Sequence, residues 1–106
     1  MTLEEFGIAA GTVLAGKYRV ERVLGRGGMG FVVAALHLEL QHLVAVKFLH
    51  GNMMANGEAV ARFAREARAA ARIRSEHVAR VLDVGRLEDG APYTVMEFFK
   101  GKTWVR

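Results

Sequence analysis

The sequence predicts an α+β fold, in which a five-stranded antiparallel sheet carries one main helix. Two observations lead to this prediction. Five short runs have the alternating or wholly apolar character of β-strands, and one longer run consists almost entirely of good helix formers. The helix follows the third strand, and short turns join the first three strands as in an antiparallel meander. With 106 residues, the chain has room for one small domain.

The first three strands fall in the N-terminal half of the chain. Residues 17–24 alternate apolar and polar side chains at first, and residues 31–38 and 43–49 are almost wholly apolar. The first connection, residues 25–30, holds four glycines in six positions. Residues 1–16 precede the first strand and are interpreted as a partly ordered N-terminal arm.

The helix is predicted over residues 58–74, which contain neither glycine nor proline. Asn56 is a suitable N-cap, and Glu58 suits the positive end of the helix dipole. Two more strands are predicted after the helix, over residues 78–84 and 92–98. The helix is therefore inserted between the third and fourth strands.

Composition excludes several classes of protein. The absence of cysteine excludes disulfides, thiolate zinc sites and a cysteine nucleophile. No apolar run approaches the roughly 18–20 residues that cross a bilayer, and the N-terminus opens with two acids rather than a basic segment. We therefore expect a cytoplasmic protein without membrane contact. His37, His42 and His50 are interpreted as solvated histidines without metal-ligand company, so no metal site is predicted.

The glycine-rich connection fits the pattern G-x-G-x-x-G-x-V. Its members are Gly25, Arg26, Gly27, Gly28, Met29, Gly30, Phe31 and Val32. Glycines here allow positive φ and remove side chains that would keep phosphates away. The dinucleotide-binding version of the pattern needs a helix directly afterwards and an acid about 20 positions on, and residues 40–57 hold neither Asp nor Glu. A hairpin that folds over nucleotide phosphates fits better, and a merely flexible turn is the alternative.

Two charged residues stand on predicted buried surfaces. Lys47 lies in an otherwise apolar strand, and Glu66 falls in the apolar stripe of the helix, which is formed by Phe63, Ala67, Ala70 and Ile73. A buried charge is costly unless it is paired, so each residue is the natural partner of the other. The alternatives are a lysine that snorkels to the surface and a glutamate at the edge of the stripe.

Together these residues resemble the N-terminal lobe of protein kinases. The segments that carry the resemblance are Tyr18–Val32, Val44–Lys47, Glu66 and Val95–Glu97, in that order. They look most like the bacterial serine/threonine kinases of eukaryotic type, in which a Gly-Gly-Met-Gly loop is typical. The resemblance covers roughly residues 12–101.

The resemblance implies an ATP site and assigns its residues. Lys47 would hold the α- and β-phosphates while paired to Glu66, and these two are the implied catalytic residues. Ala45 would form the adenine roof, Met96 the back of the pocket, and Glu97 to Phe99 the hinge. The implied nucleotide-binding residues are Leu24, Gly25, Arg26, Gly27, Gly28, Met29, Gly30, Phe31, Val32, Ala45, Lys47, Met96, Glu97 and Phe99.

The resemblance also implies catalytic parts that this sequence lacks. A kinase uses an Asp and an Asn of the catalytic loop and the Asp of D-F-G, yet no His-x-Asp occurs here. The two aspartates are Asp83, interpreted as the end of a strand, and Asp89. We therefore interpret residues 17–101 as an N-lobe whose C-lobe is absent, followed by a truncated tail at 102–106. Weak ATP binding is expected, Mg²⁺ only if a C-lobe is supplied, and no turnover from this polypeptide alone.

Two other functions stay open at this point. A non-enzymatic interaction module would use the bare cleft side of the sheet to bind a protein partner or a second copy. A nucleic-acid-binding domain would use the four arginines on the outer side of the helix, Arg62, Arg65, Arg68 and Arg72, and the net charge of +4. Basic residues without interleaved aromatics attract phosphates without reading bases, so a solvated helix face is the better interpretation.

Overall fold

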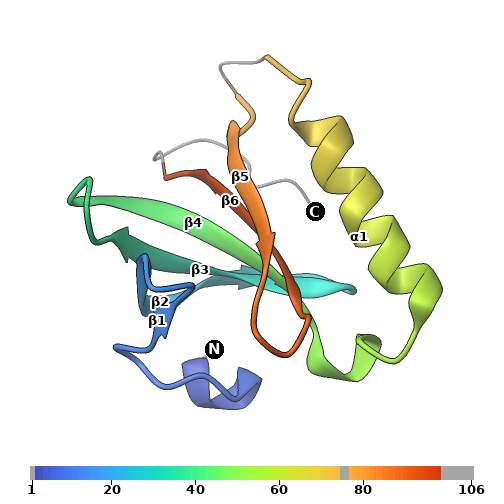
Figure 1. The fold of residues 1–106 in the computed structure, drawn as a ribbon, viewed down its shortest axis with the longest axis horizontal. Coiled ribbons are helices and arrows are strands. Elements are labelled where there is room, and N and C mark those ends of the chain that lie inside the picture. The colour runs from blue at the N-terminus through green and yellow to red at the C-terminus, as the bar shows by residue number, and fades with distance from the viewer. Residues whose placement is uncertain (1, 75–76, 99–106) are drawn as a thin grey trace.

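The computed structural model describes residues 2–74 and 77–98, which form one curved antiparallel sheet with a helix beside it (Figure 1). The elements follow one another as η1 (Leu3–Phe6), β1 (Val13–Leu14), β2 (Tyr18–Arg26), β3 (Gly30–His37), β4 (His42–Leu49), η2 (Gly51–Met53), α1 (Gly57–Ala70), β5 (Val81–Arg86) and β6 (Pro92–Glu97). The strand order is β1-β2-β3-β4-β6-β5. The predicted α+β class and the insertion of the helix after the long β2–β3–β4 meander are confirmed.

The sheet has six strands in the described residues, where the sequence predicted five. The additional strand is β1, in which Leu14 pairs with Tyr18 of β2. Ala15 and Gly16 connect β1 to β2 with φ of 51° and 69°, as in the tight turns that join hairpin strands. Two residues are too few to show an alternating pattern, so this strand depends on the edge that β2 offers it. The arm is consequently part of the sheet.

The helix begins as predicted and ends early. Asn56 is the N-cap, and its side-chain oxygen accepts hydrogen bonds from the amides of Glu58 (3.0 Å) and Ala59 (3.1 Å). The prediction that the helix continues to residue 74 is wrong, because α1 ends at Ala70. The amide of Ile73 bonds back only three residues, to the carbonyl of Ala70, and its side chain is 44% exposed. Ile73 therefore does not extend the buried stripe, whose last member is Ala70. No helix in the described ranges is long and apolar enough to span a membrane.

The two faces of the sheet bury different side chains. One face, here called the closed face, carries a continuous core to which η1 adds Leu3; its members are Leu3, Leu14, Tyr18, Val20, Phe31, Val33, Ala35, Val44, Val46, Phe48, Tyr93 and Val95. The other, here called the open face, carries Leu24, Val32, Ala45, Lys47, Val81, Thr94 and Met96. Alternation along each strand separates the two sets.

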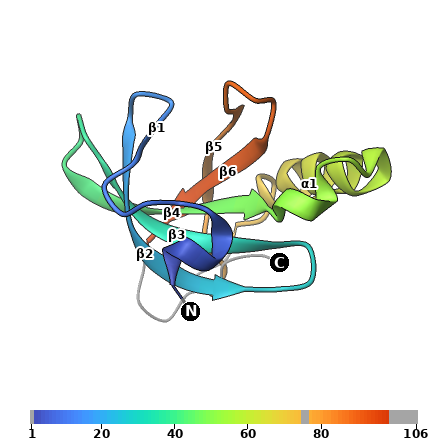
Figure 2. The same ribbon diagram turned by 90° about the horizontal axis from the view of Figure 1, so that it is seen from below.

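The helical elements η1 and α1 lie on different faces of the sheet. Phe6 of η1 stacks on Phe31 of β3, so η1 lies against the β2–β3 ribbon on the closed face (Figure 2). The longer helix α1 contacts β5 and β6 and shares a cavity with residues of the open face. The open face is therefore covered at one side only.

Candidate functional site

The glycine-rich segment is a hairpin, as the sequence predicts. Strand β2 runs into it and strand β3 leaves it, with Gly25 opposite Val32 and Arg26 opposite Phe31. The amide of Gly27 donates to the carbonyl of Gly30 at 2.8 Å and closes the turn. A strand follows the turn where a dinucleotide-binding segment would have a helix.

The four glycines of this hairpin do not all serve one purpose. None of them has a positive φ, so the conformational freedom that glycine allows is not used in this turn. A Cβ added at Gly25, Gly27 or Gly28 would have no atom within 4 Å, whereas one at Gly30 would lie 1.8 Å from the carbonyl oxygen of Phe48. Gly30 therefore allows β3 to approach β4. The other three leave open space that a ligand can occupy.

An apolar patch of the open face adjoins the hairpin. Ala45 and Met96 are fully buried and opposite each other in β4 and β6. Leu24 and Val32, each partly buried, pack against them from the two strands of the hairpin. These are the four side chains that the resemblance places around the adenine. The patch also includes Ala79, which precedes β5, and Val81 at its start, which the sequence analysis did not single out because neither belongs to a recognisable motif.

Lys47 lies beside this patch and is buried. Cross-strand pairing places it between Val32 of β3 and Thr94 of β6, and only 8% of its surface is exposed. The alternative of a lysine that snorkels to the surface is therefore not what the structure shows. Its ammonium lies 5.7 Å from the centre of the Phe63 ring on α1, a cation–π distance.

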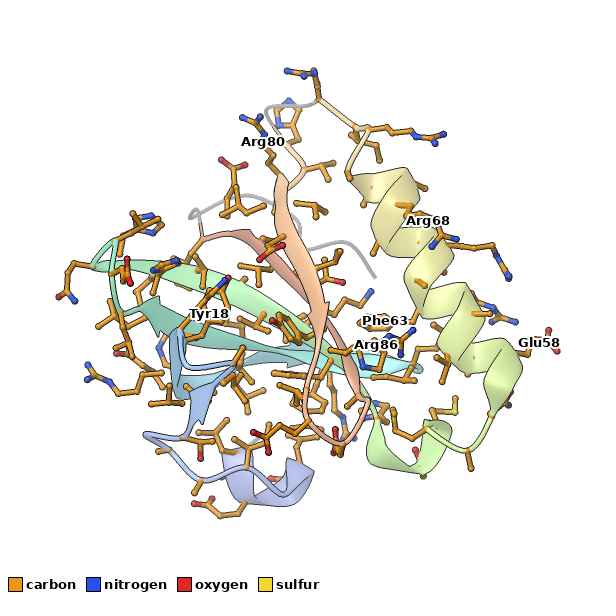
Figure 3. The ribbon with its side chains drawn as sticks, in the orientation of Figure 1. Tyr18, Glu58, Phe63, Arg68, Arg80 and Arg86 are labelled. Carbon is orange, nitrogen blue, oxygen red and sulfur yellow. The ribbon has the colours of Figure 1, made fainter. Side chains whose placement is uncertain are left out.

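Glu66 and Lys47 line the same small cavity between α1 and the sheet, together with Phe63. Phe63 points from α1 toward the sheet, while Glu58 lies on the opposite side of the helix (Figure 3). The cavity has about 10 Å³ of room, close to what one water requires. Among the described residues, the salt bridge that forms is Glu58–Arg62 at 3.8 Å, on the outer side of α1. The structure thus brings Lys47 and Glu66 to the wall of one cavity.

The predicted hinge begins at the end of β6. The amide of Glu97 donates to the carbonyl of Arg80 at 2.9 Å, and its carboxylate accepts from the amide of Arg80 at 2.8 Å. The Glu97 amide is therefore already used within the sheet. Phe99 lies outside the described residues.

Three other predicted site residues belong to the hairpin. Arg26 is exposed and Met29 is half-buried near the turn. The Phe31 side chain is buried in the closed-face core, away from Val32, so only its backbone faces the open side. The hairpin can therefore contact a ligand mainly through backbone groups, in the open space beside its glycines.

His50 is not the solvated histidine that the sequence suggested. It is half-buried, its ring stacks with Phe6 and Phe31, and its Nε2 bonds to the carbonyl of Gly27 at 2.9 Å. In the sequence His50 simply follows an apolar strand, and no local pattern shows that this position lies next to the turn of the hairpin. No cluster of acids and histidines suited to a metal ion occurs in the described part of the chain.

Comparison with known proteins identifies relatives of one kind. No family model matches the chain. It is 44% identical over 92 residues to serine/threonine-protein kinase pkn3 of Myxococcus xanthus, covering 87% of this chain and 17% of that protein. It is 36% identical over 93 residues to serine/threonine-protein kinase PrkC of Bacillus subtilis, covering 88% of this chain and 14% of that protein. The chain thus spans only a small part of these relatives.

Solved structures of kinase domains resemble the fold. The kinase domain of PknI from Mycobacterium tuberculosis matches with a TM-score of 0.66 and 35% identity, over 87% of this chain and 36% of that domain. The apo form of PpkA-294 matches with a TM-score of 0.74 and 20% identity, which shows the fold alone. The chain is therefore a homologue of the bacterial serine/threonine-protein kinases, and its fold is that of the N-terminal lobe of a kinase domain.

Proposed function

We propose that the open face binds ATP as the N-lobe of a serine/threonine-protein kinase does, and that this polypeptide by itself binds the nucleotide without transferring phosphate. One observation carries the proposal. The buried Lys47 stands opposite Val32, so a cation lies one strand away from the glycine hairpin and on the same face as the apolar patch. A triphosphate and an adenine ring need these two surfaces side by side.

The residues present fit the nucleotide. The space beside Gly25, Gly27 and Gly28 would admit phosphates close to backbone amides. Lys47 would contact the α- and β-phosphates, and Glu66, on the wall of the shared cavity, would orient its ammonium. Leu24, Val32, Ala45 and Met96 would enclose the adenine.

Phosphate transfer requires carboxylates that this face lacks. Asp83 lies in β5, where its side chain accepts a hydrogen bond from the amide of Val84 at 2.9 Å. Asp89 lies in the turn before β6 and accepts from the amide of Ala91 at 2.9 Å. Neither is a residue of the open face, so Mg²⁺ coordination and the catalytic base would have to come from a C-lobe. Affinity for ATP is expected to be weak for the same reason.

The test is a titration with ATP in which Lys47→Ala is compared with Lys17→Ala. Lys17 is an exposed lysine in the β1–β2 turn and serves as the matched control. We expect Lys47→Ala to weaken binding about tenfold or more, because charge-assisted hydrogen bonds to phosphate are among the stronger contacts, and Lys17→Ala to leave it unchanged. Equal affinity of the two variants would contradict the proposed site. A γ-phosphate transfer assay on the same samples should give no incorporation.

A basic nucleic-acid surface finds less support. Arg62, Arg65, Arg68 and Arg72 are all exposed, as a solvated helix face requires, and Arg62 pairs with Glu58. An exposed pair of this kind contributes little energy and leaves the face partly neutralised.

A further inference from the structure

The glycine hairpin is held from behind by two segments that are far from it in sequence. Phe6 of η1 stacks on Phe31, the residue after Gly30, with ring centroids 4.2 Å apart and planes 15° from parallel. The ring of His50 stacks with both, at 5.9 Å from Phe6 and 5.8 Å from Phe31. The three rings form one cluster on the closed face, directly behind the hairpin.

His50 also bonds to both sides of the turn. Its backbone amide donates to the carbonyl of Met29 at 2.8 Å, and its Nε2 donates to the carbonyl of Gly27 at 2.9 Å. Because a carbonyl only accepts, Nε2 carries a proton in this contact. Gly27 and Met29 flank the tip of the hairpin, so one residue fixes the turn at two points.

The arm that supplies Phe6 is itself anchored. Leu3 is buried in the closed-face core, and the carboxylate of Glu5 accepts a hydrogen bond from the amide of Thr2 at 3.2 Å. Farther along, the amide of Gly11 donates to the carbonyl of Val20 at 2.9 Å. The arm therefore docks along β2, the strand that leads into the hairpin.

We propose that the N-terminal arm is a brace for the glycine hairpin, with Phe6 and His50 as positioning residues that set how tightly the hairpin holds a nucleotide. The inference rests on the proposed function. A glycine-rich turn has few side-chain contacts of its own, so the hairpin can adopt several open conformations. A ligand that binds only the closed hairpin loses affinity, because part of its binding free energy is used to order the hairpin. The brace lowers the population of those open conformations before the nucleotide arrives.

Two variants of His50 separate the hydrogen bond from the ring stack. His50→Phe keeps a ring against Phe6 and Phe31 but removes the donor to Gly27. His50→Gln removes the ring but keeps an N–H at a similar reach. Phe6→Ala removes the stack from the side of the arm, and Leu87→Ala, a partly buried residue packed on the same core from the β5–β6 turn, is the control for lost apolar contact.

The first measurement is amide hydrogen exchange without nucleotide. It follows the amides of Gly27 and residue 50, which the hairpin contacts protect, and amides in the middle of β4 and β6 as internal references. We expect exchange at Gly27 to rise about fivefold in His50→Phe and in Phe6→Ala, the factor that corresponds to one lost hydrogen bond or ring contact. His50→Gln, which keeps the donor but loses the ring, should fall between wild type and His50→Phe, and Leu87→Ala should stay within about twofold of wild type. Unchanged exchange at Gly27 in both His50→Phe and Phe6→Ala would overturn the brace.

The second measurement is the affinity for ATP of the same variants. His50→Phe and Phe6→Ala should bind about fivefold more weakly, and His50→Gln should recover most of the loss. A purely structural role would instead lower thermal stability while leaving Gly27 exchange and affinity unchanged. Faster exchange combined with wild-type affinity would overturn the link to nucleotide binding. A wild-type chain that binds no ATP would contradict the proposed function and not the brace, because the exchange experiment contains no nucleotide.

Discussion

The closed and open faces of this sheet are completed in different ways. The closed face is covered by side chains of its own chain. Aromatic and branched side chains of η1 and of all strands except β5 form its core. The apolar cluster of the open face has a smaller buried part, formed by Ala45, Ala79 and Met96, and Leu24, Val32 and Val81 pack against it while partly exposed. The two buried polar side chains of the described residues, Lys47 and Thr94, are both on the open face.

This difference indicates that the closed face mainly stabilises the fold, while the open face is suited to bind a ligand. Apolar burial stabilises a fold roughly in proportion to area, so most of the stabilisation comes from the closed face. A buried ammonium and unfilled space beside glycines contribute nothing comparable to stability. Their presence on the open face is understandable if that face is completed by a ligand. Substitutions on the two faces should therefore have separable effects.

The largest expected effect is a loss of stability on substitution of Gly30, the glycine of the hairpin that the packing of β3 against β4 requires. Gly30→Ala would place a Cβ 1.8 Å from the Phe48 carbonyl oxygen, so β3 and β4 would have to separate. We expect a loss of at least about 3 kcal/mol in the free energy of unfolding, measured by urea denaturation. Gly27→Ala is the matched control and should change stability by less than about 0.5 kcal/mol, because no atom lies within 4 Å of its added Cβ. Similar losses in both variants would refute this distinction.

Two neighbouring valines of β3 give a sharper comparison of the faces. Val33 is completely buried in the closed-face core, whereas Val32 is partly buried on the open face. Val33→Ala should lower the free energy of unfolding by about 2 kcal/mol and leave affinity for ATP unchanged. Val32→Ala should cost less than about 1 kcal/mol but weaken ATP binding. If the variant with the greater loss of stability also had the greater loss of ATP affinity, the contributions of the two faces to stability and to binding would not be separable.

A smaller effect is expected at alkaline pH and only from the closed face. Burial, followed by the nearby Asp83 carboxylate, raises the pKa of Tyr18 and of Tyr93 above 10.0. The folded state therefore keeps these protons after the unfolded state has lost them. The contribution of the two tyrosines to the free energy of unfolding is thus constant below pH 10 and falls as pH rises through that value. The slope is at most about 1.4 kcal/mol per pH unit for each tyrosine.

Thermal denaturation across this pH range checks the prediction. Tyr18→Phe should show a shallower alkaline decline than wild type, whatever its stability at neutral pH. Lysines titrate in the same range in both proteins, so the difference between the two slopes isolates the tyrosine. Identical slopes would mean that Tyr18 titrates alike in the folded and unfolded states.

The elements with a local signal could be predicted from the sequence. Strands β2, β3 and β4 and the start of α1 follow from apolar pattern and from the N-cap Asn56, and all four are present. What was missed depends on contacts between distant segments. Strand β1 pairs with the edge of β2, and α1 ends at Ala70, so that Ile73 lies beyond the helix with an exposed side chain.

The candidate site shows the same limit. The kinase resemblance grouped Lys47, Val32, Ala45 and Met96 in one site, and the register of β3, β4 and β6 brings their side chains to one face of the sheet. The role of His50 was not predictable, because it needs the arm to fold back and bring Phe6 to the hairpin. The direct pairing of Lys47 with Glu66 stays a prediction, and the structure brings both residues to one cavity.

The most direct test of the central claim is an ATP titration followed by the NMR signals of methyl groups on both faces. Val32, Ala45 and Met96 report on the open face, and Val33, Val46 and Val95 on the closed face of the same three strands. We predict that ATP shifts the first set progressively and to saturation while the second set stays within error. No shift at millimolar ATP, or shifts of equal size on the two faces, would contradict the assignment of nucleotide binding to the open face.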